Sequence, residues 1–323
     1  MKDSITPAPD VAAYCLGKLG PGQIEKYSGF VRKSGLTVPI LGFLHIGRPD
    51  IGQSYGDLIY NGYEDGLLVS NGRVNPRNRP EITAWPEQVA QLKQNSSVRK
   101  IFMSIGGQGY NNIFDFRTIE YMLKKGLAGV LELNFGMLRG MFRTEAGDYA
   151  VDGIDLDCEE DVDPDTIVSF SRMLFDLGFE VTFGPYRYMS FWEDCMKQLW
   201  SEGHKVSWWN LQFFDGGYKN RPNIRLWLQS LANVVGNADA GSYLMAGVAA
   251  QGGGQANGQC PTGGGGVEES FSNWREMELG LRGGFLWNYD VINENSGKGP
   301  CGAAPVGLRD YVQAVTRGLT GTV

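Results

Sequence analysis

The sequence predicts an α/β fold, a parallel (β/α)8 TIM barrel. Short apolar runs alternate along the chain with longer amphipathic stretches, which is typical of strands that alternate with helices. Eight such runs fit into the 323 residues, the number of strands in this barrel. The runs are continuously apolar, as expected of parallel strands that are buried on both faces. An open, doubly wound sheet is the alternative, but eight units and the absence of GxGxxG after the first strand make it a poorer match.

The expected elements follow one another in a regular order. The eight strands are expected at residues 11–17, 38–46, 100–107, 151–159, 179–186, 206–214, 243–251 and 284–291. Between most of them, apolar residues recur at i, i+3 and i+4, the spacing of an amphipathic helix. These helices are expected at residues 85–93, 113–125, 165–177, 191–203, 224–235, 267–281 and 307–319.

Two connections differ from short loops. Segment 47–80 follows the second strand and contains LIYNG and LLVSNG, so we expect a small hairpin inserted there. Segment 252–266 follows the seventh strand and is rich in glycine, so we expect a flexible loop. Because no Lys-Ser/Thr pair follows its glycines, it is not a phosphate-binding P-loop. No repeat or linker divides the chain, and we expect a single domain over residues 1–323.

Composition favours a neutral ligand. Acidic residues outnumber basic ones by 36 to 29, which disfavours a nucleic-acid partner. The chain offers 8 Trp, 14 Tyr and 16 Phe as stacking faces for sugars or other flat ligands. With only 2 His, little is available for a His-based metal site or a Ser-His-Asp triad, and we expect neither a metal nor a cofactor. No apolar run reaches about 18 residues, so no transmembrane helix is expected.

The cysteines and the N-terminus bear on the compartment. The chain has five cysteines and no CxxC pair, so a structural zinc site is not expected. Cys260 and Cys301 lie in glycine-rich loops and either pair in an oxidising compartment or remain free thiols. The first residues, MKDSITPAPD, lack the apolar segment of a signal peptide. The protein is therefore either cytosolic or secreted with its signal removed, and we favour the second.

Three carboxyl groups lie at the end of the fourth expected strand, in the sequence VDGIDLDCEE. Because a strand alternates its faces, Asp155, Asp157 and Glu159 should all point into the barrel, at the end where such barrels carry their chemistry. Carboxylates at close range cannot all ionise easily, so at least one should have a raised pKa. Glu159, the outermost, is the natural proton donor. The alternative is a solvated acidic strand end. Asp152 has the opposite parity and should brace the start of the strand.

Four segments together resemble family 18 of the glycoside hydrolases, the chitinases and endo-β-N-acetylglucosaminidases. DGIDLDCE resembles the DxxDxDxE signature of this family. KIFMSIGGQG resembles its SxGG element, with Ser104, Gly106 and Gly107 at the matching positions. WNLQFFDGG is similar to its strand-six segment, and GGFLWNYD places Trp287 at the position of its sugar-stacking tryptophan.

The resemblance implies a substrate-assisted retaining mechanism. Glu159 would protonate the leaving oxygen and later act as base toward water, while the 2-acetamido carbonyl of the substrate attacks C1. Asp157 would orient the acetamido group, and Asp155 would tune the pKa of Asp157. Trp287 would stack on the sugar at the cleaved bond.

Other residues are assigned to the substrate, with one departure from the family pattern. Gly107, Gln212 and Asp215 match its substrate-binding positions, whereas Phe214 stands where the family usually places a tyrosine. Tyr186, at the end of the fifth expected strand, could supply the missing hydroxyl. We therefore expect a hydrolase of β-1,4 linkages at N-acetylglucosamine, acting on chitin and its oligomers or on the chitobiose core of N-glycans. The alternative is a weakly active or non-catalytic lectin or inhibitor on the same scaffold. Its partner in either case is an N-acetylglucosamine-containing saccharide, and we expect a monomer.

Overall fold

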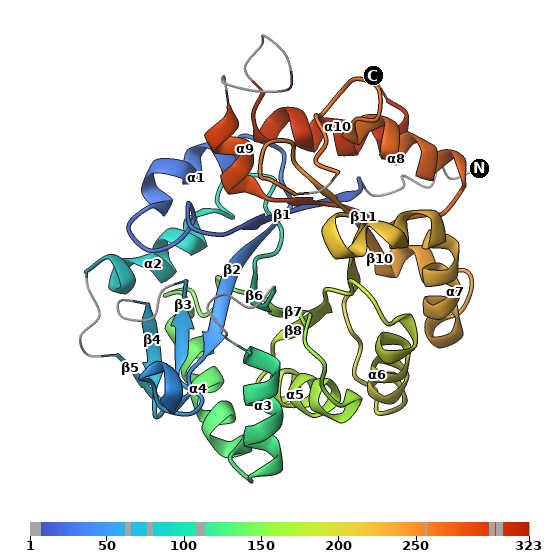
Figure 1. Ribbon diagram of the computed structural model, residues 1–323. Coiled ribbons are helices and arrows are strands. Elements are labelled where there is room, and N and C mark those ends of the chain that lie inside the picture. Colours follow the sequence, from blue (N-terminus) through green and yellow to red (C-terminus); the bar gives the residue numbers. More distant parts are fainter. Residues whose placement is uncertain are drawn as a thin grey trace.

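Eight parallel strands close into a barrel in the computed structural model, which describes residues 8–61, 66–75, 80–107, 114–255, 257–296, 301 and 306–322 (Figure 1). Because β1 pairs with both β2 and β11, the ring has no open edge. The predicted (β/α)8 barrel is confirmed. The barrel strands are β1 (Asp10–Cys15), β2 (Val38–Ile46), β6 (Phe102–Gly106), β7 (Gly153–Asp157), β8 (Glu180–Phe183), β9 (Trp209–Gln212), β10 (Leu244–Ala249) and β11 (Gly283–Trp287).

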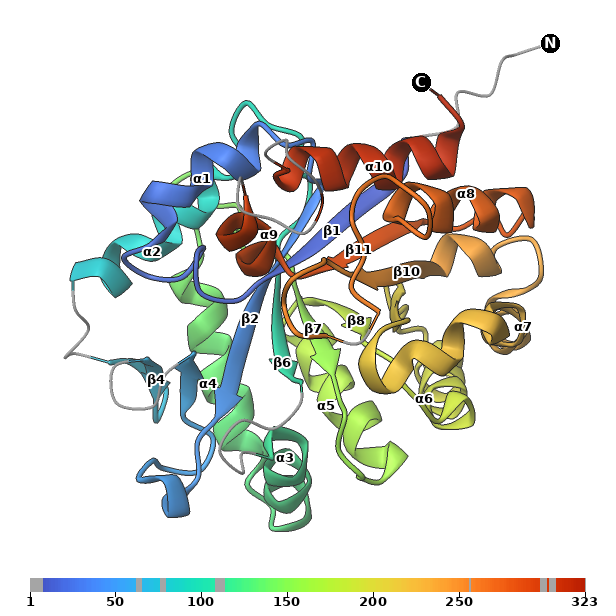
Figure 2. The ribbon, with the colours of Figure 1, turned by 45° about the horizontal axis from the view of Figure 1, so that its top comes forward.

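Helices surround the barrel on the outside (Figure 2). The α-helices are α1 (Ile24–Arg32), α2 (Pro80–Gln91), α3 (Asp115–Lys124), α4 (Ala128–Met141), α5 (Pro164–Asp176), α6 (Met189–Ser201), α7 (Ile224–Val235), α8 (Val267–Glu276), α9 (Tyr289–Asn295) and α10 (Leu308–Thr320). Short 3-10 helices are η1 (Pro49–Ile51), η3 (Asp215–Asn223) and η4 (Ala240–Tyr243). Helix α7 has the predicted bounds and buries Ile224, Trp227 and Leu231 on one face. In the described part of the chain, no helix has both the length and the apolar character needed to span a membrane.

Most barrel strands end earlier than their apolar runs. The fourth barrel strand, β7, stops at Asp157, and β9 stops at Gln212, where the sequence predicts strands to 159 and 214. The clearest difference follows β11, which was expected to reach residue 291. There the side chain of Asn288 accepts a hydrogen bond of 3.0 Å from the amide of Val291 and caps α9. This cap ends the strand and starts a helix four residues before the expected end of the strand.

The insertion after β2 forms an antiparallel extension of the barrel sheet. Strands β3 (Leu58–Tyr60) and β4 (Leu67–Ser70) form the predicted hairpin, and β5 (Arg73–Val74) adds a third strand that the sequence did not predict. Strand β3 pairs with the last residues of β2, and β4 and β5 lie beside α4 (Figure 1). The insertion therefore lengthens the wall of the barrel next to the end of β2.

Apolar side chains fill the barrel interior as a layer separate from the core between strands and helices. This inner cluster includes Phe102, Trp208, Phe214 and Phe285, with Trp287 partly exposed at its edge. Glycines make room for the large rings. A Cβ atom at Gly153 would lie 2.4 Å from the Phe102 ring, and one at Gly247 would lie 2.0 Å from the Phe285 ring. The interior is thus a packed core, which supports the side chains at the carboxyl ends of the barrel strands.

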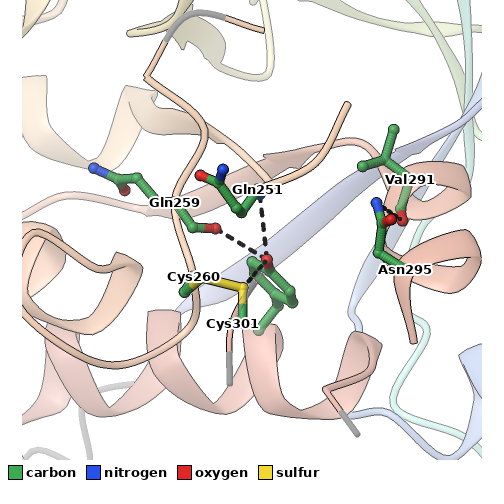
Figure 3. The surroundings of a disulfide bond; sticks show 7 residues. Gln251, Gln259, Cys260, Val291, Asn295 and Cys301 are labelled. Carbon is green, nitrogen blue, oxygen red and sulfur yellow. Dashed lines mark hydrogen bonds between the residues drawn. A yellow bond between two sulfur atoms is a disulfide. The ribbon is translucent and has the colours of Figure 1, made fainter. Parts of the chain in front are cut away.

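A disulfide joins Cys260 to Cys301 and fixes the loop that follows β10 (Figure 3). The hydroxyl of Tyr311 lies beside it, where it donates a hydrogen bond of 2.9 Å to the carbonyl of Gln259 and accepts one of 3.3 Å from the amide of Gln251. Of the two alternatives for these cysteines, paired or free, the structure shows the pair. The loop that was expected to be flexible is constrained by the disulfide and by these hydrogen bonds.

Replacing both cysteines, Cys260→Ser with Cys301→Ser, should lower the free energy of unfolding. The bond closes a span of 41 residues, and loss of such a cross-link costs about 2–4 kcal/mol because the unfolded chain gains entropy. Denaturant unfolding without reductant should show this difference between the variant and the wild type. With reductant the two proteins should unfold alike, and equal midpoints under both conditions would contradict the prediction.

Candidate functional site

Three carboxyl groups lie at the carboxyl end of β7. Ile154 and Leu156 pack in the outer core, so Asp155 and Asp157 face the barrel interior, as the alternation along the strand predicted. Glu159 lies two residues beyond the end of the strand and is half-buried. The three groups form a column that runs from the barrel interior to its mouth.

Asp155 is fully buried and accepts hydrogen bonds from four side chains. Tyr14 Oη and Ser104 Oγ donate to its Oδ2 over 2.7 and 2.8 Å. Thr182 Oγ1 and Asn210 Nδ2 donate to its Oδ1 over 2.7 and 2.9 Å. Burial raises the pKa of Asp155, and these hydrogen bonds oppose the rise because they stabilise the ionised form.

Asp157 lies next in the column and is 2% exposed. Gln212 Nε2 donates a hydrogen bond of 2.8 Å to its Oδ1. Burial, followed by repulsion from Glu159 and then Asp155, raises the pKa of Asp157 well above its usual value. Burial and the two neighbouring carboxyl groups therefore all favour the protonated form of Asp157.

The predicted SxGG element on β6 supports the column from the side. Ser104 binds Asp155, and the amide of Gly107 donates a hydrogen bond of 2.8 Å to the carbonyl of Asp157. Gly106 adopts φ +105°, and a Cβ atom there would lie 2.2 Å from the same carbonyl oxygen. Only glycine permits this approach of β6 to β7.

Glu159 stands at the mouth between groups of both charges. Burial raises the pKa of Glu159, and repulsion from exposed Asp215 raises it further. A hydrogen bond from Gln212 and the positive charge of Arg187 act in the opposite direction. Gln212 thus contacts both Asp157 and Glu159 and links these two carboxyl groups. The charges of Asp215 and Arg187 act on Glu159 in opposite directions.

An aromatic surface faces the column across the barrel. The Trp287 ring is partly exposed, with the Tyr14, Phe43 and Phe214 rings at centroid distances of 5.2, 6.0 and 5.9 Å. Phe214 is inclined by only 21° to Trp287 and is 4% exposed. The partly exposed indole is a suitable face for a sugar, and Phe214 supports it without offering a hydroxyl.

Tyr186 lies on the Glu159 side of the site. Its ring lies beside Gly216, where a Cβ atom would approach to 2.6 Å, and under the Arg187 guanidinium at 4.9 Å. Burial raises the pKa of Tyr186, and the charge of Glu159 raises it further. Tyr186 is therefore near the outermost carboxyl group, while Phe214 packs against Trp287.

Sequence reasoning missed three partners of Asp155, namely Tyr14, Thr182 and Asn210. Each is a polar side chain within an otherwise apolar run, and this was the signal that could have revealed them. Both oxygens of Asp155 are occupied by protein donors. Within the described ranges, no three His, Cys, Asp or Glu side chains are grouped as a metal site requires.

Replacing Asp215 by asparagine should lower the pKa of Glu159, because the carboxylate that repels its ionised form is removed. Asparagine tolerates the φ of 45° at this position. The pH titration of the labelled Glu159 carboxyl carbon, followed by NMR, should move to lower pH in Asp215→Asn. Asp239→Asn, at the opposite end of the barrel, is the control and should leave the titration in place. A shift to higher pH in Asp215→Asn would show that the repulsion is misassigned.

No protein-family model matches the chain, and no curated protein matches it. Solved structures do. A fungal endo-β-N-acetylglucosaminidase of glycosyl hydrolase family 18 is 20% identical with a TM-score of 0.62, covering 98% of this chain and 99% of the other. A chitinase from Bacteroides thetaiotaomicron is 14% identical with a TM-score of 0.53, covering 97% of each chain.

A third structure is human YKL-39, described as a pseudo-chitinase with retained chitooligosaccharide binding. It is 14% identical with a TM-score of 0.56, and the match covers 98% of this chain and all of the other. At these identities the likeness establishes the fold alone. The chain has the barrel fold of family 18 chitinases and endo-β-N-acetylglucosaminidases, which confirms the predicted resemblance at the level of the fold.

Proposed function

We propose that this chain is a family 18 glycoside hydrolase that cleaves β-1,4 linkages at N-acetylglucosamine. The observation that carries the proposal is the column of Asp155, Asp157 and Glu159 facing the partly exposed ring of Trp287. Strands β7 and β11 are four strands apart in either direction around the barrel, so the column and the ring lie on opposite sides of its mouth. A sugar stacked on Trp287 would present its glycosidic bond to Glu159.

In the proposed mechanism Glu159 donates its proton to the glycosidic oxygen as the bond from C1 to that oxygen breaks. The carbonyl oxygen of the substrate's own 2-acetamido group attacks C1 and forms an oxazolinium ion. Water then attacks C1 from the side that the leaving sugar vacated. The bond from C1 to the acetamido oxygen breaks, which restores the acetamido group, and Glu159 takes the proton of the water. The raised pKa of Glu159 fits the first step, because the group must still carry a proton near neutral pH.

Asp157 and Asp155 have different roles in this proposal. Asp157 holds the acetamido N–H and stabilises the positive charge that develops on it. Gln212 fixes the Asp157 carboxyl through its hydrogen bond of 2.8 Å. Asp155 is held by four hydrogen-bond donors and, after burial and the charge of Glu159, contributes to the raised pKa of Asp157 through repulsion. This arrangement lets Asp157 exchange its proton as the charge on Glu159 changes.

Two substrate classes fit the site, namely chitin and its oligomers, and the chitobiose core of N-glycans. Both present N-acetylglucosamine on the side of the bond that Trp287 would bind. Asp215 and Tyr186 lie on the Glu159 side and would contact the sugar beyond the bond. Gly107 keeps β6 close to β7 and leaves the space over Asp157 to the substrate.

A second function, saccharide binding without efficient cleavage, is favoured by Phe214. Where the resemblance implies a tyrosine hydroxyl, this ring packs against Trp287 and Phe285 and supplies no donor to the attacking acetamido oxygen. Loss of one such donor lowers turnover by about 10²–10³-fold. A barrel with this fold can bind chitooligosaccharides as a pseudo-chitinase, as YKL-39 is described to do.

Hydrolysis of a fluorogenic chitobioside and release of a glycan from a high-mannose glycoprotein test the proposal. Glu159→Gln should lower turnover of an unactivated oligosaccharide by at least about 10²-fold, because the proton donor is lost. Glu160→Gln is the matched control, since Glu160 instead accepts hydrogen bonds from the amides of Phe116 and Arg117 at the start of α3. This control should remain active.

The outcomes separate the two functions. Full activity of Glu159→Gln would contradict the assignment of the acid. A wild-type protein that binds chito-oligosaccharides tightly and cleaves neither substrate would establish the binding function instead. A product released with retained anomeric configuration, seen by NMR, is the expected signature of the substrate-assisted route.

Asp157→Asn should reduce activity more than Asp152→Asn, because only Asp157 faces the site. Asp152 points the other way, where it accepts a hydrogen bond of 2.7 Å from the amide of Ile101 and pairs with Lys93 at 2.7 Å. The expected loss for Asp157→Asn is about 10²-fold or more in kcat, by analogy with the loss of other groups that stabilise charge in a transition state. Asp152→Asn should mainly lower the melting temperature. Equal kinetic losses in two folded variants would contradict this division.

A further inference from the structure

A carboxyl group on α9 holds the loop that follows β1. Asp290 Oδ2 accepts a hydrogen bond of 2.7 Å from the amide of Leu16, and its Oδ1 accepts two of 2.9 Å, from the amides of Gly17 and Lys18. Helix α9 lies beside β1 in both views of the ribbon (Figure 1 and Figure 2). Successive backbone N–H groups that converge in this way form a concave site for an anion. Here a side chain of the protein itself occupies that site.

An ion pair joins the same two elements but holds them less firmly. Lys18 Nζ lies 2.8 Å from Glu294 Oε1, and the Glu294 side chain is 67% exposed. Exposed ion pairs contribute little, because water and salt screen them. Hydrogen bonds from amides to a carboxylate are charge-assisted and fix the geometry of both partners. Asp290 therefore fixes the loop after β1 to α9 more firmly than this ion pair does.

Leu16 is held from its other side by the residue that follows β3. Asn61 Nδ2 donates a hydrogen bond to the carbonyl of Leu16, and Asn61 Oδ1 accepts one of 2.6 Å from the amide of Phe43. The amide of Asn61 donates a further hydrogen bond of 3.0 Å to the carbonyl of Phe43. The side chains of Leu16, Phe43 and Trp287 pack together against the edge of the inner apolar cluster. Leu16 is thus fixed through both its amide and its carbonyl.

These contacts form a closed circuit around the aromatic surface. Trp287 ends β11, and Asp290 lies three residues later, in the first turn of α9. Asp290 binds Leu16, and Leu16 is joined to Asn61. Asn61 in turn binds Phe43, whose ring centroid lies 6.0 Å from that of Trp287. The placement of the Trp287 ring against its neighbours therefore depends on the hydrogen bonds at Asp290.

We propose that Asp290 is a positioning residue for Trp287. By fixing α9 against the loop after β1, it keeps the indole at the orientation on which a sugar stacks with its glycosidic bond toward Glu159. Asp290 acts through the ring and makes no contact with the sugar itself. Because a small displacement of a bound substrate strongly lowers its rate of reaction, a loosened indole lowers productive binding. This inference rests on the proposed function and extends it.

Asp290→Ala should lower kcat/KM about threefold to tenfold, the range expected for loss of most of one aromatic contact. The substrate is whichever of the fluorogenic chitobioside and the high-mannose glycoprotein the wild type cleaves. In a Trp287→Ala background the same replacement should change kcat/KM by less than about twofold, because the ring through which Asp290 acts is absent. This lack of additivity distinguishes positioning of the ring from a general loss of stability.

Two further variants accompany this cycle. Asp290→Asn keeps one oxygen acceptor, so its kcat/KM should lie between those of the wild type and Asp290→Ala, and it replaces the alanine variant in the cycle if that variant does not fold. Asp310→Ala is the matched control. Asp310 also lies in the first turn of a helix, α10, and accepts a hydrogen bond of 2.8 Å from the amide of Gly307. Its loss should leave kcat/KM at the wild-type value.

The other outcomes have distinct meanings. A wild-type kcat/KM in folded Asp290→Ala would overturn the inference and leave the proposed function intact. An equal fall with and without Trp287 would also overturn it, because Asp290 would then act elsewhere. If the wild type cleaves neither substrate, the proposed hydrolase is overturned, and the Kd for chitotetraose replaces kcat/KM in the same cycle. A wild-type protein that also fails to bind chitotetraose would overturn this inference as well.

Discussion

The buried carboxylate of Asp155 is the constraint on which the rest of the site depends. A carboxylate without water is tolerated only where donors surround it, and here they come from four other strands, through Tyr14, Ser104, Thr182 and Asn210. Ser104 and Thr182 can reach it because β6, β7 and β8 pair in register at this residue. Five of the eight strands are thereby tied together directly beneath the mouth of the barrel, and the Asp155 carboxyl group is fixed under Asp157.

The electrostatics at the mouth depend on the place of this carboxyl group. Asp157 lies between two other carboxyl groups, is buried, and therefore retains a proton more readily than an ordinary aspartate. Gln212 links it to Glu159, so the protonation of one group affects the other. Exposed Asp215 and Arg187 then adjust Glu159 from outside in opposite directions. Burial thus raises the pKa of all three carboxyl groups in the column, while hydrogen bonds to each of them oppose the rise.

The aromatic surface depends on the same residue network. The Tyr14 hydroxyl donates a hydrogen bond to Asp155, and the centroid of its ring lies 5.2 Å from that of Trp287. The Trp287 ring and the carboxyl column are thus joined through Tyr14, a side chain of β1. Beneath them, glycines such as Gly247 leave space for the aromatic rings that fill the barrel. The geometry across the mouth is set by this packed interior, with Arg187 and Asp215 near Glu159 at its rim.

The sequence by itself determined what depends on local periodicity: the eight-stranded barrel, the hairpin after β2, and the inward direction of Asp155 and Asp157. The order of apolar runs and amphipathic stretches, the turn residues between short runs, and the alternation of faces along one strand are enough for these, because each is a property of neighbouring residues. Only the tertiary structure decided which strands donate to Asp155, that Cys260 pairs with Cys301, and that Asn288 ends β11 and begins α9. The donors and the disulfide join residues far apart in the chain, and their meeting depends on how the closed barrel sets the register of its strands. The Asn288 cap is local, but the apolar pattern around it is shared by strand and helix, so only the folded backbone separates the two.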